Sequence, residues 1–267
     1  MTELVLLETG LYVFTGVFAG FVAGLLGVGG GLIIVPVLFF SFAYQGYEPQ
    51  HLMHMALTTS LATIVITSVS STLAHHKKGA VLWPSVFILT PGLLLGAWLG
   101  GLTASEIDSQ SLRVFFALFE LFVAITMIFK LQSRRQAKKI NTLSGSIGGI
   151  FIGFISTLVG IGGGTLTVPF LHWFNTPMRM AVATSAACGF PIALFATLSY
   201  VFASWEIDTG SSYSIGYLQT YALLIIASCS FLFAPLGAKV AHTISEKKLR
   251  LTFAGLLLSL SAIMFFS

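Results

Sequence analysis

Two glycine-rich segments of closely similar sequence occur in this chain of 267 residues, one in each half. They read GFVAGLLGVGGGLIIVPVL over residues 20–38 and GFISTLVGIGGGTLTVPFL over residues 153–171, and ten of their nineteen aligned positions are identical. Each places three consecutive glycines between apolar stretches: Gly29, Gly30 and Gly31 in the first, and Gly162, Gly163 and Gly164 in the second. In a membrane, such a run interrupts a helix and leaves backbone N–H groups that lipid cannot satisfy.

Free N–H groups at the N-terminus of a helix bind anions, because the aligned peptide dipoles place a partial positive charge there. Glycine allows the anion to approach the backbone. Paired helix interruptions in the two halves of a transporter also point to its substrate site. We therefore predict that an anion binds between the two glycine runs. The alternative is that these glycines only let helices pack closely.

A pair of hydroxyl residues follows each glycine segment. Thr59 and Ser60 align with Thr184 and Ser185, 125 residues further along the chain. Hydroxyl groups can coordinate an oxyanion, and we expect these four side chains to contact the bound anion. The alternative is that they bond back to the backbone of their own helices, which is common for Ser and Thr in membrane helices.

One acidic residue, Glu120, lies in the middle of the apolar stretch LRVFFALFELFVAITMIF. A charged side chain at the centre of the bilayer costs about 2.5–3.5 kcal/mol on insertion scales, so it faces a cavity or a partner. Its aligned residue in the second half is Leu257, so internal symmetry does not explain it. We predict a role for Glu120 in proton coupling. The alternative is a protonated carboxyl group bonded to a neighbouring helix.

The composition is that of a membrane protein: 56% of the residues are apolar and only 8% are charged. A soluble domain normally has about 25% charged residues. The net charge of +4 comes from basic residues in short loops, which is typical of cytoplasmic loops, so no nucleic-acid partner is expected. The sequence contains neither a Walker A motif nor the H-E-x-x-H and G-x-S-x-G motifs of common hydrolases. We expect no enzyme activity, no cofactor and no metal site.

We predict ten apolar segments, five in each half of an all-α polytopic protein. Two of them, 31–44 and 164–174, are shorter than the roughly 20 residues that a crossing requires, so we expect short broken or re-entrant helices there. The ten segments are 4–26, 31–44, 52–74, 81–101, 110–130, 142–160, 164–174, 178–203, 216–238 and 246–266.

The basic residues predict the orientation, because cytoplasmic loops are enriched in Lys and Arg. Lys77, Lys78 and the basic stretch 130–139 then face the cytoplasm, whereas the loops 45–51, 102–109 and 204–215 contain five acids and no Lys or Arg. An odd number of segments in each half makes the second half enter upside down, as an inverted-topology repeat. We predict a first repeat over 1–130, a basic cytoplasmic linker over 131–140 and a second repeat over 141–267.

The paired phrases Gly27–Pro36 and Gly160–Pro169, each followed by a Thr-Ser pair, resemble those of the sulfite exporter TauE/SafE family of membrane permeases. The resemblance covers nearly the whole chain. It implies a secondary transporter in the cell inner membrane for a small sulfur-containing anion such as sulfite, thiosulfate or an organosulfonate. The anion, the direction of transport, the coupling ion and assembly into a homo-oligomer are left open. A non-transporting scaffold or assembly factor and, last, a membrane-embedded enzyme remain as alternatives.

The topology can be tested by cysteine labelling. The distribution of Lys and Arg predicts that both chain termini lie outside and that a cysteine placed at Arg134 reacts with an impermeant reagent from the cytoplasmic side. Labelling of residue 134 only from the outside would contradict the inverted-repeat arrangement.

Overall fold

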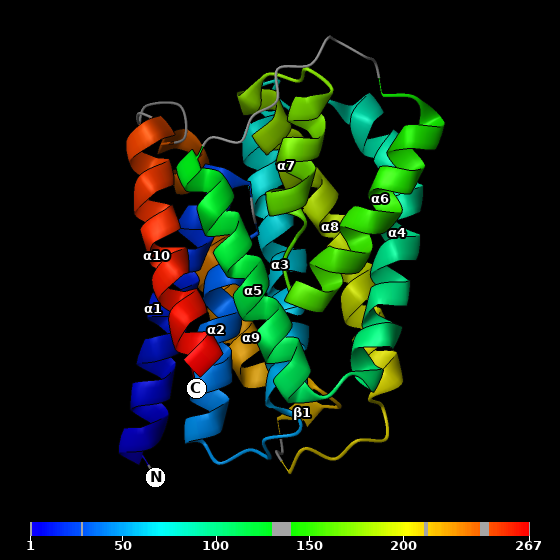
Figure 1. The fold of residues 1–267 in the computed structure, drawn as a ribbon. Helices are drawn as coiled ribbons and strands as arrows, with labels where there is room; N and C mark the ends of the chain where they lie inside the picture. Colours follow the sequence, from blue (N-terminus) through cyan, green and yellow to red (C-terminus); the bar gives the residue numbers. More distant parts are fainter. Residues whose placement is uncertain (1, 28, 130–139, 211–212, 241–245, 267) are drawn as a thin grey trace.

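The computed structural model describes residues 2–27, 29–129, 140–210, 213–240 and 246–266 (Figure 1). Within these ranges the chain forms ten α-helices and one two-stranded hairpin. The predicted linker, Arg134 included, lies outside the described residues apart from Ile140. The elements are α1 (Thr2–Leu26), α2 (Gly31–Tyr44), α3 (Leu52–His76), α4 (Trp83–Glu106), α5 (Ser109–Phe129), α6 (Thr142–Val159), α7 (Gly164–Trp173), α8 (Met178–Ala203), β1 (Ser214–Ile215), β2 (Leu218–Gln219), α9 (Thr220–Val240) and α10 (Glu246–Phe266).

Each predicted apolar segment overlaps one of these helices over most of its length, so the all-α fold class is confirmed. Seven helices are long and apolar enough to cross a membrane: α1, α3, α4, α5, α6, α8 and α9. The helices α2 and α7 have 14 and 10 residues and span about 21 and 15 Å at 1.5 Å per residue. Neither reaches across a hydrocarbon core of about 30 Å, as the segment lengths predict.

The start of the ninth segment differs from the prediction. The sequence predicts an apolar segment from residue 216, whereas α9 begins at Thr220. The preceding residues form the β1–β2 hairpin, in which Ser214 pairs with Gln219 and Ile215 with Leu218. The turn includes Gly216 with φ 54°, a left-handed conformation that glycine adopts without steric cost.

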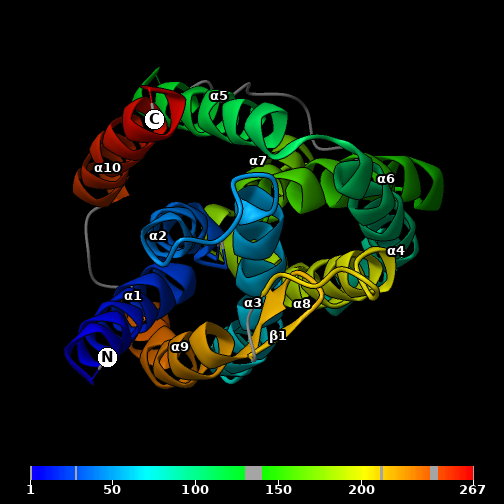
Figure 2. The same ribbon diagram turned by 90° about the horizontal axis from the view of Figure 1, so that it is seen from below.

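The helix contacts follow the internal repeat, and most of them join a helix of the first half to a helix of the second. Exchanging each helix for the one five places away along the chain turns the contacting pairs α1–α9, α2–α3 and α3–α9 into the contacting pairs α6–α4, α7–α8 and α8–α4. The same exchange leaves the pairs α3–α8 and α5–α10 unchanged. Viewed along the helices, α3 lies in the interior of the bundle, between α2 and α8 (Figure 2). The ends of α5 and α6 that flank the undescribed 130–139 lie on the upper side of Figure 1, opposite the β1–β2 hairpin.

Close contacts at glycine hold the outer helices to their partners. A Cβ atom added to Gly20 of α1 would lie 2.5 Å from the Cα of Ser230 on α9. At the aligned position, a Cβ added to Gly153 of α6 would lie 2.5 Å from the carbonyl oxygen of Leu93 on α4. Further glycines lie four residues away, at Gly16 and Gly149. Small residues at this spacing let helix backbones approach closely in a membrane, where burial of apolar surface gives helices little reason to associate.

Gly20→Ala and Gly153→Ala should each destabilise the protein, because the added methyl group meets backbone atoms rather than a side chain that can move. Overpacking of this kind costs about 1–3 kcal/mol, which we expect as a lower melting temperature of the purified protein in detergent. Gly10→Ala is the matched control on α1, since a Cβ there has no atom within 4 Å. If all three variants have the same melting temperature, these contacts do not contribute to stability.

Candidate functional site

The two glycine runs, 133 residues apart in the sequence, meet in the interior of the bundle. A Cβ atom added to Gly29 would lie 3.3 Å from the Cα of Gly162, and one added to Gly162 would lie 3.6 Å from the Cα of Gly29. The two backbones are therefore in direct contact. We call this contact the glycine crossing.

The backbone around the crossing requires glycine at several positions. Gly27 and Gly160, which follow α1 and α6, have φ values of 68° and 70°. Gly30 and Gly163, the N-cap residues of α2 and α7, have φ values of 81° and 74°. This left-handed region is accessible to glycine and strained for most other residues. The two helix breaks thus share left-handed glycines at these two positions, but they differ at Gly29, whose φ of 82° has no counterpart at Gly162.

The helices α2 and α7 begin without side-chain caps, because their N-cap residues are glycines. The carbonyl oxygen of Gly30 accepts hydrogen bonds from Ile33 and Ile34, and that of Gly163 accepts from Leu166 and Thr167. The two amides that precede these in each helix make no backbone hydrogen bond within the described residues. These amides are the N–H groups of Gly31, Leu32, Gly164 and Thr165, and the residue four positions before Leu32 lies outside the described part of the chain. Each break therefore presents unpaired donors at the positive end of a helix.

The serine of each Thr-Ser pair donates a hydrogen bond across the crossing. Ser60 Oγ on α3 donates to the carbonyl oxygen of Gly160 over 3.0 Å. Ser185 Oγ on α8 lies 3.1 Å from the carbonyl oxygen of Gly27 and 2.8 Å from that of Val182 on its own helix, so its hydroxyl is shared between these two acceptors. Each serine thus fastens the glycine break of the opposite half. Both side chains are fully buried.

The threonines of the same pairs anchor the segments that lead into two other helices. Thr59 Oγ1 accepts a hydrogen bond from the backbone N–H of Gln219, just before α9, over 3.1 Å. Thr184 Oγ1 accepts one from Leu82, just before α4, over 3.0 Å. All four hydroxyl groups therefore have partners within the protein. Their predicted contact with the anion stays a prediction.

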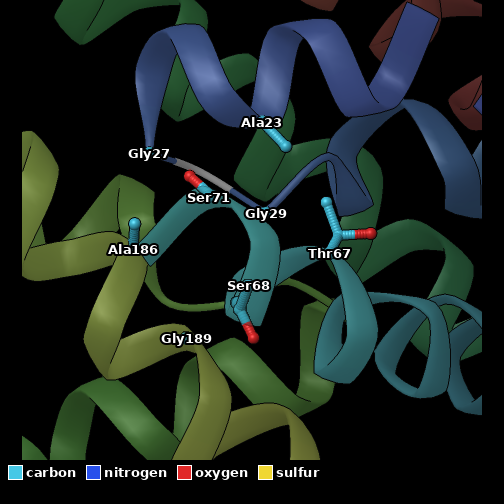
Figure 3. A pocket seen from close by; sticks show the side chains of 9 residues that line it. Ala23, Gly27, Gly29, Thr67, Ser68, Ser71, Ala186 and Gly189 are labelled. Atoms are coloured by element: carbon cyan, nitrogen blue, oxygen red, sulfur yellow. The ribbon is translucent and has the colours of Figure 1, made fainter. Parts of the chain in front are cut away.

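A small cavity lies beside the glycine crossing (Figure 3). Two of the predicted site residues, Gly29 and Gly162, line it, and the remaining predicted glycines and hydroxyl residues do not. The centre of a water molecule can reach about 10 Å³ of it, which is the space that a single water needs. A sulfur oxyanion does not fit without movement of the walls. The lining residues are Ala23, Gly27, Gly29, Thr67, Ser68, Ser71, Gly162, Ala186 and Gly189.

Three hydroxyl residues of α3 in this lining were not predicted as site residues. Thr67 and Ser68 donate to the carbonyl oxygens of Thr63 and Val65 on their own helix, each over 3.0 Å. Ser71 is buried, and its Oγ has no hydrogen-bond partner within the described residues. It is the hydroxyl donor that remains for a ligand in the cavity. The run TSVSST over residues 67–72, with five hydroxyl residues among six, was the signal in the sequence.

The cavity forms on one side of the crossing because the two halves differ there. The residues of α8 that align with Thr67, Ser68 and Ser71 are Ile192, Ala193 and Ala196. Gly189, which lines the cavity, aligns with Ile64. The Cγ2 atom of Ile64 lies 2.8 Å from the position of a Cβ on Gly162 and 3.1 Å from that of a Cβ on Gly29. Ile64 therefore fills the space whose counterpart is left open beside Gly189.

Glu120 lies away from this cavity, on the buried face of α5, a helix that packs against α10. Its side chain is fully buried, and neither carboxyl oxygen has a hydrogen-bond partner within the described residues. Arg113 lies two turns earlier on the same face, with its guanidinium carbon 5.8 Å from the centre of the Phe39 ring. The structure thus places Glu120 away from the glycine crossing and without a hydrogen-bond partner among the described residues.

The described residues contain no cluster of three or more His, Cys, Asp or Glu side chains that could hold a metal ion. The cavity is lined by neither a charged side chain nor a histidine. The donors at the crossing are therefore backbone amides and hydroxyl groups, which bind an anion through hydrogen bonds and helix dipoles.

Comparison with known proteins identifies the family. The family model described as sulfite exporter TauE/SafE matches residues 12–264. A probable membrane transporter protein of Haemophilus influenzae is 36% identical over 256 residues, which are 96% of this chain and 97% of that protein. A probable membrane transporter protein of Methanocaldococcus jannaschii is 32% identical over 92% of this chain and 91% of its own length. No solved structure matches the chain. With its membrane-spanning helices and this match, the chain belongs to the sulfite exporter TauE/SafE family of multi-pass membrane transporters, which are not enzymes.

Proposed function

We propose that this chain is a secondary transporter that moves a small sulfur-containing anion, such as sulfite, thiosulfate or an organosulfonate, across the cell inner membrane. The observation that carries the proposal is the glycine crossing: two helix N-termini with free amides meet beside a cavity into which Ser71 brings an unpaired hydroxyl. Oxyanions bind at such N-termini without a cationic side chain. The family description supports a sulfur oxyanion as the substrate class.

We further propose that residues 1–130 and 141–267 are inverted-topology repeats joined by a basic cytoplasmic linker over 131–140. Three paired features support this. The helix contacts correspond between halves, the glycine pairs Gly27/Gly160 and Gly30/Gly163 have similar φ values, and the Ser60 and Ser185 hydrogen bonds are exchanged between the halves. Repeats of this kind allow one half to rock against the other around a fixed site.

The anion would bind to the amides of Gly31, Leu32, Gly164 and Thr165 and to hydroxyl groups around the crossing. Because the cavity has room for about one water, this conformation is closed, and the breaks must separate to admit the anion. The Thr-Ser pairs form hydrogen bonds between the two halves, and they lie next to the glycine breaks that separate. Their hydroxyl groups can contact the anion once these bonds open.

Ser71→Ala should weaken anion binding without lowering stability. The Ser71 hydroxyl has no partner to lose, whereas a hydrogen bond to an anion is worth about 1.5–3 kcal/mol, or about 10- to 150-fold in affinity. Affinity for sulfite and thiosulfate and the melting temperature are measured on the same purified variant. Thr72→Val is the matched control, since its hydroxyl is also unpaired but does not line the cavity. Equal affinities in the two variants would place the anion elsewhere.

Glu120→Gln should uncouple transport from the proton gradient while the protein still folds and binds its anion. The carboxyl group is buried at membrane depth without a partner among the described residues, and such an acid is the usual carrier of a transported proton. The measurement is uptake of labelled anion into proteoliposomes with and without an imposed pH difference. Glu106→Gln, at an exposed acid at the end of α4, is the control. A Glu120→Gln protein that still concentrates the anion like the wild type would assign Glu120 a structural role.

A further inference from the structure

A second group of unpaired hydroxyls lies beside Gly163, the residue that follows Gly162 of the cavity lining. Ser156 near the end of α6 and Thr167 on α7 are both fully buried, and neither hydroxyl has a hydrogen-bond partner within the described residues. A Cβ atom added to Gly163 would lie 3.3 Å from Thr167 Oγ1 and 3.4 Å from Ser156 Oγ. Both hydroxyl oxygens are thus in reach of one point, which glycine leaves free of a side chain.

The surroundings of this point favour an anion over a cation. The carbonyl oxygens nearby are already engaged: Gly163 accepts from Leu166 and Thr167, and Ser156 accepts from Ile161. The groups left over are donors, namely the two hydroxyls and the free first-turn amides of α7 at Gly164 and Thr165. Donors at the positive end of a helix select negative charge.

The fold itself does not require these hydroxyls. The residues of the first half that align with Ser156 and Thr167 are Ala23 and Ile34, both apolar and buried. A glycine break with the same left-handed N-cap, Gly30, therefore forms there without any hydroxyl group at these two positions. A buried hydroxyl without a partner is unfavourable, so a ligand that pairs with both Ser156 and Thr167 would account for their presence.

In this conformation a side chain of α8 closes the position. The Cδ1 methyl of Ile192 is the atom nearest to the Cβ position of Gly163. A terminal methyl group moves by rotation about a single side-chain bond, without a shift of the backbone. Ile192 aligns with Thr67, which lines the cavity, so the two halves carry their hydroxyls on different elements.

We propose that Ser156 and Thr167 form a second binding station for the transported sulfur oxyanion, next to the cavity and closed by Ile192 when it is empty, and that the first-turn amides of α7 serve both positions. The proposal rests on the transport function proposed above. In this proposal the anion crosses in two steps, because it passes between the Ser71 cavity and the Ser156–Thr167 station.

The test compares threonines whose hydroxyls are unpaired. Thr167→Val and Ser156→Ala should each lower the rate of anion uptake into proteoliposomes at least about 10-fold, the effect of one lost charge-assisted hydrogen bond. Equilibrium binding at the Ser71 cavity should stay within about twofold of the wild type, because neither Ser156 nor Thr167 lines that cavity. Thr72→Val, whose hydroxyl is also unpaired but lies on α3 outside the cavity lining, should transport like the wild type. Sulfite and thiosulfate are the probes, and uptake, equilibrium affinity and melting temperature are recorded for each variant.

The outcomes separate this station from the transport function itself. If the wild type neither binds nor transports either probe, the proposed function fails and the comparison of variants does not arise. If the wild type transports and Thr167→Val and Ser156→Ala match it, the station is overturned. Unchanged uptake together with a lower melting temperature would show that the hydroxyls hold a structural water only. Equal losses in Thr167→Val and Thr72→Val would also overturn the proposal, because they would not depend on the Gly163 position.

Discussion

The structure depends on the contact between two stretches of polypeptide backbone at Gly29 and Gly162. Irregular backbone within a membrane is tolerated only where protein or water, rather than lipid, surrounds it. Here each helix break is covered by the other break and by the long helices α3 and α8, so neither break is stable alone. This dependence explains why the chain contains two such glycine-rich segments. It also means that the glycine crossing forms only when the helix bundle assembles.

The hydrogen bonds around the crossing follow from the same constraint. Breaking α1 from α2 and α6 from α7 frees carbonyl oxygens as well as amides. Ser60 and Ser185 satisfy the carbonyls of Gly160 and Gly27, each from the opposite half. No equivalent bond reaches the first-turn amides within the described residues. The first-turn amides thus remain as donors at the positive end of each short helix, an arrangement that favours an anion.

The positions of most helices could be predicted from the sequence, because helix ends in this chain coincide with Gly, Pro and charged residues that separate the apolar segments. The two short helices and the repeated phrases were predictable from length and identity. The pairing partners were not, since a hydroxyl such as Ser60 can bond to its own helix or to a carbonyl 100 residues away with equal local propensity. The hairpin at 214–219 was missed because its residues continue into an apolar run. Ser71 was missed because nothing local to TSVSST shows which of its hydroxyls points into a cavity.

The difference between Ile64 and its aligned residue in the other half, Gly189, has a consequence for the conformation of the proposed transporter without anion. In a protein built from two identical inverted halves, the conformations open to either side of the membrane would have equal free energy by symmetry. Every difference between aligned residues removes part of that degeneracy. In the transporter proposed above, a bulky side chain that fills one side of the crossing, opposite a glycine that leaves the other side open, would favour one of these conformations in the absence of anion. Because apparent affinity scales with the fraction of molecules in the binding-competent state, this pair of residues would then contribute to the choice of the membrane side from which the anion binds.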